Sequence, residues 1–125
     1  MNFLAGREFP VGKGKNNLLG ANIRFNWNGG VRFSPVLLEA SRNAGTAVRN
    51  WTQAYEGQAR DYLRLDLQFN YRRNRSKTTH EWRLDIQNAT NRANELEHYY
   101  DQGTGNIVSD TQLGFIPVLS YRVEF

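Results

Sequence analysis

Charged side chains of both signs recur at every second position in several stretches of the chain. The residues that follow this pattern are Arg24, Arg32, Arg64, Asp66, Arg83, Asp85, Arg122 and Glu124. Strands in a sheet lie about 4.8 Å apart, so side chains of this kind can form cross-strand ion pairs on one face. We therefore expect a structural lattice of salt bridges. Such a face could also bind an anionic solute or, if the sheet forms the wall of a barrel, a plug domain inside the barrel.

Enzymatic chemistry is not indicated by any of these residues. Paired carboxylates act as acid and base only where a pocket separates their pKa values, and here every carboxylate has an arginine on its own face. The stretch His80–Leu84 begins like a zinc-protease helix but lacks the second histidine. Gly103-Thr104-Gly105 lacks the third glycine of a dinucleotide loop. We expect no catalytic residues, no bound metal and no cofactor.

Nucleic-acid binding is not indicated either. The net charge of +4 and the interleaved aromatic and arginine residues would suit it. However, the aromatic side chains and the arginines fall on opposite faces of their segments, which separates stacking from charge neutralisation. We therefore expect no nucleic-acid partner.

The elements that must position these residues are strands, because apolar and polar residues alternate with a period of two. From Leu63 to Tyr71 every second residue is apolar, and the residues between them are polar or charged. The same alternation covers residues 19–27, 31–34, 82–87 and 112–125. The sequence predicts an all-β fold, an antiparallel up-and-down meander of about five strands.

The connections between these segments alternate in length. Gly29-Gly30 is predicted to form a two-residue hairpin turn with positive φ angles, and Arg73–Thr79 is a short polar link. Residues 39–61 and 90–110 are long and polar, and the second contains a small predicted hairpin around Asp101–Asn106. In bacterial outer-membrane barrels short turns face the periplasm and long loops face outward. We expect the same placement here.

The composition is compatible with such a barrel although it is polar. Hydrophobic residues make up 39% of the chain and the mean hydropathy is −0.69. A transmembrane barrel alternates lipid-facing and lumen-facing residues, so its mean hydropathy stays low. No apolar run reaches the length of a membrane-spanning helix. Aromatic residues near the predicted strand ends would form an interfacial girdle: Trp27, Tyr71, Trp82 and Tyr121.

Three stretches resemble the C-terminal strands of TonB-dependent receptors of Bacteroidetes. They are Asp61–Leu67, Trp82–Arg92 with its Asn-Ala-Thr-Asn turn, and Leu113–Phe125 with its terminal aromatic residue. Residues 29–35 and 38–42 look similar to the preceding hairpin and loop, so the resemblance spans most of residues 18–125. Ala89 is smaller than the residue usual at its position in that family.

The resemblance implies that residues 1–125 are one segment of an integral outer-membrane receptor for energised nutrient uptake. The segment would supply barrel wall, extracellular loops and, in Tyr121, Val123 and Phe125, the signal read by the barrel-assembly machinery. Its partners would be lipid, the rest of the barrel with its plug, and TonB through an N-terminal part.

A signal sequence, a TonB box and a plug domain are not found in these residues, and about eight strands are needed to close a barrel. We therefore expect a C-terminal fragment. The alternatives are a small soluble ligand-binding β-barrel or sandwich, with the aromatic face inward, and a porin-like channel without TonB coupling. The transported solute is not indicated by the sequence.

Overall fold

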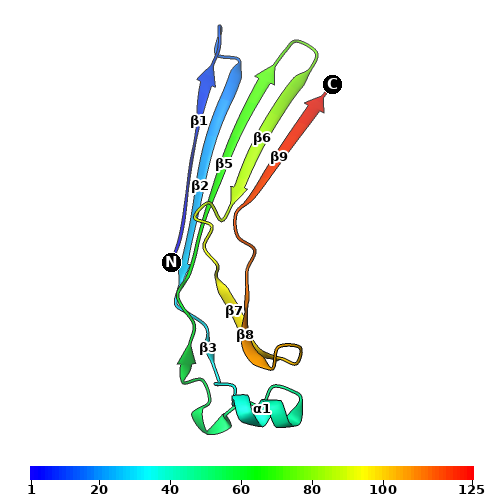
Figure 1. Cartoon of the computed structure of the whole chain (residues 1–125). Coiled ribbons are helices and arrows are strands. Elements are labelled where there is room, and N and C mark those ends of the chain that lie inside the picture. Colours follow the sequence, from blue (N-terminus) through cyan, green and yellow to red (C-terminus); the bar gives the residue numbers. More distant parts are fainter. The chain divides into compact units, whose positions relative to one another are not determined.

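The computed structural model describes all residues from Met1 to Phe125 (Figure 1). The elements in chain order are β1 Asn2–Val11, β2 Asn17–Asn28, β3 Arg32–Phe33, α1 Leu38–Ala44, the 3-10 helix η1 Trp51–Gln53, β4 Gly57–Gln58, β5 Tyr62–Asn74, β6 Thr79–Gln87, β7 Glu95–Asp101, β8 Asn106–Thr111 and β9 Ile116–Glu124. They belong to two compact units. Residues 1–27, 63–92 and 114–125 form the sheet unit, and residues 28–62 and 93–113 form the loop unit.

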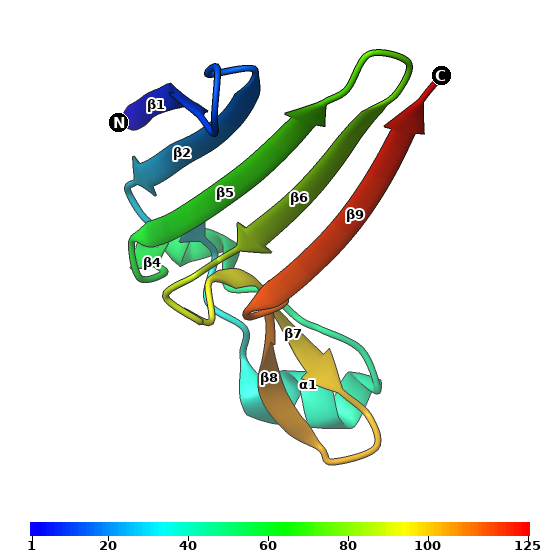
Figure 2. The same cartoon turned by 90° about the horizontal axis from the view of Figure 1, so that it is seen from above.

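The sheet unit is a five-stranded antiparallel sheet in the order β1-β2-β5-β6-β9. Each strand lies beside the strands that precede and follow it in this sheet, which confirms the predicted up-and-down meander. Seen from above in Figure 2, the strands form an open sheet that is not closed or curled into a barrel.

The register of the sheet matches the alternation in the sequence. Tyr71 pairs with Trp82, and Trp82 pairs with Tyr121 on the next strand. A slip of one residue would turn each side chain to the other side of the sheet. The register therefore sorts the side chains into an apolar face and a polar face.

The apolar face carries the hydrophobic side chains Phe3, Phe9, Leu19, Ile23, Phe25, Trp27, Leu63, Leu65, Leu67, Phe69, Tyr71, Trp82, Leu84, Ile86, Leu119, Tyr121 and Val123. No hydrophobic side chain in the chain is buried, and Leu119 remains 76% exposed. The polar face carries Asn22, Arg24, Arg64, Asp66, Gln68, Asn70, Arg72, Glu81, Arg83, Asp85, Ser120, Arg122 and Glu124. The sheet is thus amphipathic and has no hydrophobic core.

The loop unit contains short elements joined mainly by polar contacts. Its hairpin β7–β8 pairs Tyr99 with Val108 and Tyr100 with Ile107, which confirms the hairpin predicted around residues 101–106. The hydroxyl of Ser41 donates to the carbonyl of Leu37 at 2.7 Å and accepts from the backbone N–H of Val48 at 2.9 Å. The helix α1 has seven residues, and no helix of the chain is long and apolar enough to cross a membrane.

Two details of the predicted strand order are wrong. The first strand of the sheet is β1, which the alternation did not reveal, because Leu4 lies on the polar face and Arg7 on the apolar face. The segment predicted as a strand at residues 31–34 is reduced to β3, which pairs with β4 in the loop unit.

The predicted Gly29-Gly30 hairpin turn is also wrong, since β2 is followed in the sheet by β5. Neither glycine has a positive φ angle. A side chain at Gly30 would clash with the backbone carbonyl of Ala59, so a close approach of two segments requires glycine there. Within the five-stranded sheet, positive φ angles at glycine occur in the β1–β2 turn, at Gly12 and Gly14.

Gly29-Gly30 was expected at the same end of the sheet as the Arg73–Thr79 link, but it lies at the opposite end. The chain leaves β2 at one end of the sheet and makes the β5–β6 turn at the other end, because β2 and β5 are antiparallel neighbours. Short and long connections still alternate. The short ones are residues 12–16 and 75–78, and the long ones are residues 29–61 and 88–115.

Candidate functional site

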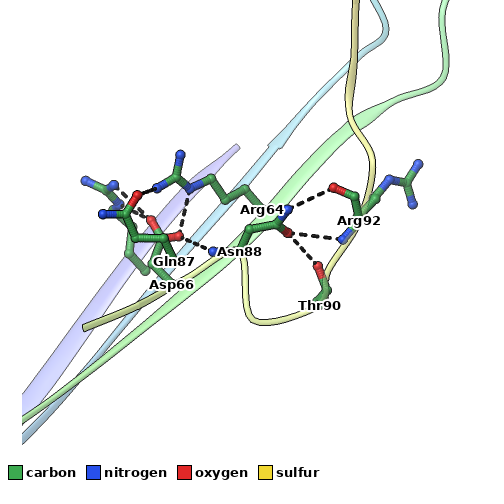
Figure 3. Close-up of polar contacts among 7 residues, drawn as sticks. Arg64, Asp66, Gln87, Asn88, Thr90 and Arg92 are labelled. Carbon is green, nitrogen blue, oxygen red and sulfur yellow. Dashed lines mark hydrogen bonds and ion pairs between the residues drawn. The ribbon is translucent and has the colours of Figure 1, made fainter. Parts of the chain in front are cut away.

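The centre of the polar face is the carboxylate of Asp66 on β5 (Figure 3). The Nη2 atom of Arg24 on β2 lies 2.9 Å from its Oδ2, and the Nε of Arg64 lies 2.7 Å from its Oδ1. The Nη2 of Arg64 also donates to Oε1 of Gln87 on β6 at 3.0 Å. One carboxylate thus joins two arginines, and the group connects three adjacent strands.

A second carboxylate, that of Glu81 on β6, joins Arg72 and Arg83. Its Oε2 lies 3.5 Å from Nη2 of Arg72, and its Oε1 lies 3.1 Å from Nη2 of Arg83. Glu81 is among the buried residues of the chain. Burial of a carboxylate is costly unless it is paired and hydrogen-bonded, and here both oxygens have a partner.

Neutral amides continue this network between the two carboxylate centres. The Nδ2 of Asn22 donates to Oε1 of Gln68 at 2.8 Å, and the Nε2 of Gln68 donates to Oδ1 of Asp85 at 2.6 Å. Asp85 therefore contacts an amide on the neighbouring strand, where the sequence suggested an arginine.

The lattice includes pairs along a strand as well as pairs between strands. Arg64 and Asp66 are two residues apart on β5, and Arg122 and Glu124 are two residues apart on β9 at 2.8 Å. The second of these pairs is well exposed, since the side chains of Arg122 and Glu124 keep 71% and 55% of their accessibility. Exposed pairs contribute little to stability.

Arg32 does not belong to the lattice. It lies on β3 in the loop unit, because the hairpin predicted at Gly29-Gly30 does not form. There it borders a hollow of about 300 Å³ together with Trp51 and Tyr55. The prediction of Arg32 as a member of the charged lattice is wrong.

The polar face is concave around Asp66. A hollow of about 460 Å³ is lined by Arg24, Arg64 and Asp85 among others, with Leu4 and Val118 from the outer strands. Paired charges and amides in an open hollow can hold water or a polar surface in place. No group of histidine, aspartate and glutamate residues in the chain is arranged to hold a metal ion.

A tight turn after β6 is built around Asn88, which is buried and has a positive φ angle of 49°. Its Nδ2 donates to the carbonyl of Arg92 at 2.8 Å, and its Oδ1 accepts from the backbone N–H of Arg92 at 3.2 Å and from the hydroxyl of Thr90 at 3.1 Å (Figure 3). Asn91, with a φ of 52°, accepts the backbone N–H of Phe115 at 2.9 Å. Asn88 therefore closes this turn with its side chain, and Asn91 ties the turn to the segment just before β9.

On the apolar face, three of the predicted girdle residues form one aromatic row across β5, β6 and β9. The ring centroids of Tyr71 and Trp82 are 5.7 Å apart, and those of Trp82 and Tyr121 are 5.2 Å apart. Trp27 does not join this row. It is near the end of β2, and because β2 and β5 are antiparallel, it lies at the other end of the sheet from Tyr71. We name Tyr71, Trp82 and Tyr121 the aromatic row.

The residues predicted as an assembly signal continue the apolar face of β9. Tyr121 pairs with Trp82 and Val123 pairs with His80. Phe125 follows the last residue of β9 and is fully exposed. Its ring has no neighbours in the sheet, so it is free to contact a partner.

Sequence reasoning missed Glu81, Gln68 and the turn-forming role of Asn88. The first two lie on the polar parity of their strands, so alternation alone places them beside Arg83 and Asp66. Asn88 could be found because asparagine is one of the few non-glycine residues that tolerate positive φ. In comparisons with protein-family models, curated proteins and solved structures, no match to this chain was found.

Proposed function

We propose that this chain is part of the wall of a bacterial outer-membrane β-barrel, the C-terminal portion of a TonB-dependent receptor for nutrient uptake. The observation that carries the proposal is an amphipathic antiparallel meander whose apolar face is uncovered and in which no hydrophobic residue is buried. Large exposed apolar faces mark protein or membrane contacts. Lipid on the apolar face would supply the apolar surroundings that the chain itself lacks.

The polar face supports the same arrangement. A lumen lined by polar side chains accommodates Arg24, Arg64 and Asp66, whereas an arginine facing lipid at the bilayer midplane costs about 2 to 4 kcal/mol. In this proposal the polar face contacts the lumen and docks the plug of the complete receptor. The loop unit supplies extracellular segments. The TonB contact belongs to a part of the receptor outside these residues, and the chain performs no catalysis.

The choice of a TonB-dependent receptor over a porin-like channel rests on the sequence resemblance alone. The Asn88–Arg92 turn is part of that resemblance, and Asn88 holds its conformation. The barrel-assembly machinery would then recognise β9 through Tyr121, Val123 and the exposed Phe125.

Cysteine labelling tests the orientation of the sheet, and the absence of native cysteine makes single substitutions unambiguous. The chain is folded in phosphatidylcholine vesicles with cysteine at Leu65 or Leu67, or at Arg64 or Asp66, and treated with a water-soluble maleimide. We expect the two apolar-face positions to be protected and the two polar-face positions to react. The opposite pattern would invert the assignment.

Solubility separates this proposal from the soluble alternative. We expect the chain to require detergent or lipid to stay monodisperse. A soluble monomer without detergent, with Leu65 and Leu67 protected from the same maleimide, would support the ligand-binding barrel or sandwich and overturn the membrane proposal.

A further inference from the structure

The sheet has one end at which both short turns lie side by side. The β1–β2 turn covers residues 12–16 and the β5–β6 turn covers residues 75–78. They are joined through Asn74, whose Nδ2 donates to the carbonyl of Asn16 at 2.6 Å and whose backbone N–H donates to Oδ1 of Asn17 at 3.1 Å. Figure 1 shows both turns and the C-terminus at this end. We name it the turn end.

The turn end is strongly basic. Lys13 and Lys15 are exposed in the first turn, and Arg75 and Lys77 are exposed in the second. Arg73, in the last part of β5, points to the apolar face, because it has the parity of Tyr71, and it pairs in the register with His80. None of these five cations is in an ion pair.

The acidic groups near the turn end do not cancel this charge on the apolar side. Glu8, Glu81 and Glu124 lie on the polar face, and the last two are paired with arginines. An anion that approaches along the apolar face therefore meets uncompensated cations.

Polarity is ordered in layers along this part of the apolar face. Leu84 and Leu119 pair below the aromatic row. Above the row, Nδ1 of His80 and the hydroxyl of Tyr121 are 2.7 Å apart, and Nε2 of His80 is 3.3 Å from the hydroxyl of Thr78. Arg73 and the turns follow. The order from aliphatic to aromatic to polar to cationic groups matches the order from acyl chain to headgroup in a phospholipid leaflet.

Arg7 on β1 begins deeper in the apolar face, where it lines a hollow with Leu67 and Phe69, but its charged end is directed toward the turn end. It lies on the apolar face, and its guanidinium carbon is 5.1 Å from the ring centroid of Phe9, which is two residues closer to the turn end. The side chain thus leans over an aromatic ring toward the basic turns. Long cationic side chains near an interface direct their charged ends toward the headgroups in this way.

We propose that the turn end of the apolar face binds the headgroups of anionic phospholipids in preference to zwitterionic ones. The inference rests on the proposed function in one respect, namely that the apolar face contacts lipid. Arg73, Arg75 and Lys77 together with Lys13 and Lys15 supply the charge for lipid phosphates, and the aromatic row fixes the depth of the sheet in the leaflet.

The test is flotation of the full chain with vesicles, either of phosphatidylcholine alone or with phosphatidylglycerol as a third of the lipid. We expect tighter binding to the anionic vesicles, decreasing with added salt. Each cation removed near an anionic surface should lower the partition coefficient about fivefold. The double substitution Arg73→Gln with Lys77→Gln should therefore lower binding to anionic vesicles roughly 25-fold, while binding to phosphatidylcholine remains unchanged.

The matched control is Arg32→Gln with Arg60→Gln. It removes the same charge from exposed residues of the loop unit. We expect the control to bind anionic vesicles like the parent chain. Equal losses in the two variants would mean that only net charge matters and would overturn the inference.

Further outcomes distinguish the inference from the proposed function. If the parent inserts into both kinds of vesicle with the expected cysteine labelling but without preference for phosphatidylglycerol, the headgroup inference is wrong and the wall proposal stands. If it inserts into neither, both fail. Displacement from anionic vesicles by inorganic phosphate, but not by sodium chloride of the same ionic strength, would identify a site for the free anion and overturn the commitment to lipid.

Discussion

The backbone N–H of Asn88 donates a hydrogen bond of 2.9 Å to Oδ1 of Asp66. The same oxygen lies 2.7 Å from Nε of Arg64, and the other carboxylate oxygen, Oδ2, forms an ion pair with Nη2 of Arg24 at 2.9 Å. One carboxylate on β5 therefore connects the ion pairs of the polar face to the tight turn after β6. Substitutions at Asp66 and at Asn88 should consequently affect the same part of the sheet.

We predict that Asp66→Asn lowers the free energy of unfolding by about 2 to 3 kcal/mol, because two arginines lose a charged acceptor in a half-buried place. The matched exposed substitution is Arg122→Gln, which breaks the pair with Glu124 and should cost less than about 1 kcal/mol. Urea unfolding of the chain in phosphatidylcholine vesicles measures both. Equal losses of unfolding free energy in the two variants would show that Asp66 stabilises the sheet no more than an exposed ion pair does.

For the turn we predict an order of effects. Asn88→Ala loses three side-chain hydrogen bonds and puts alanine at a positive φ angle, which together should cost about 2 to 4 kcal/mol. Asn88→Gly loses the same bonds without the conformational penalty and should cost less. Thr90→Ala removes a single bond and serves as the mild control at about 1 kcal/mol. The same unfolding assay applies, and a glycine variant as unstable as the alanine variant would contradict the importance of the φ angle.

Alternation predicted the strands that carry the polar face, since a strand with one apolar face leaves a period of two in its sequence. It therefore placed Arg24, Arg64, Asp66 and Arg83 on the same side of the sheet. The parity of a residue in its strand does not determine which neighbouring side chain it bonds to. The partner depends on side-chain length and on which other acceptors are nearby, so Asp85 bonds to Gln68 and Arg83 to Glu81.

The errors in the strand order have a different origin. Gly29-Gly30 looks like a hairpin turn in the sequence, but glycine also occurs where backbones approach closely, and the contact of Gly30 with Ala59 is of that second kind. The partner in that contact is far along the chain, so no local pattern reveals it. The strand β1 was missed because Leu4 and Arg7 interrupt its alternation.

The turn of the β7–β8 hairpin gives a prediction about pH. The hydroxyl of Thr104 donates to Oδ2 of Asp101 at 2.8 Å, and the backbone N–H of Gly103 donates to Oδ1 at 3.1 Å. These bonds, the Thr104 hydroxyl first, lower the pKa of Asp101 below its ordinary value. A carboxyl whose pKa is lowered by folding stabilises the turn above its unfolded pKa, and this contribution is lost as the pH falls through the folded pKa.

We predict that Thr104→Val raises the pKa of Asp101 toward its ordinary value, because the largest of these interactions is removed. The pKa is measured from the carboxyl carbon chemical shift of Asp101 during an NMR titration. Thr111→Val, at the other end of β8, is the control and should leave the titration of Asp101 unchanged. A pKa of Asp101 that does not respond to Thr104→Val would refute the assigned cause.

Phe125 provides the last prediction, which concerns assembly rather than stability. The ring is fully exposed beyond the end of β9 and contacts nothing in the sheet, so its removal should change the free energy of unfolding by no more than about 0.5 kcal/mol, as for other surface substitutions. Recognition of an extended client is different, because a strand that joins a sheet edge is bound by main-chain hydrogen bonds and by pockets for alternate side chains. Tyr121 and Val123 present such alternate side chains on one face of β9, and Phe125 follows Val123 at the same spacing just beyond the strand. We therefore predict that Phe125→Ala slows insertion of the chain several-fold into vesicles that contain purified barrel-assembly machinery, while its stability after insertion is unchanged.

Phe115→Ala, which removes an aromatic ring just before β9, is the matched control and should insert at the parental rate. Insertion of Phe125→Ala at the parental rate together with a lowered resistance to urea would assign Phe125 to stability and remove it from the assembly signal.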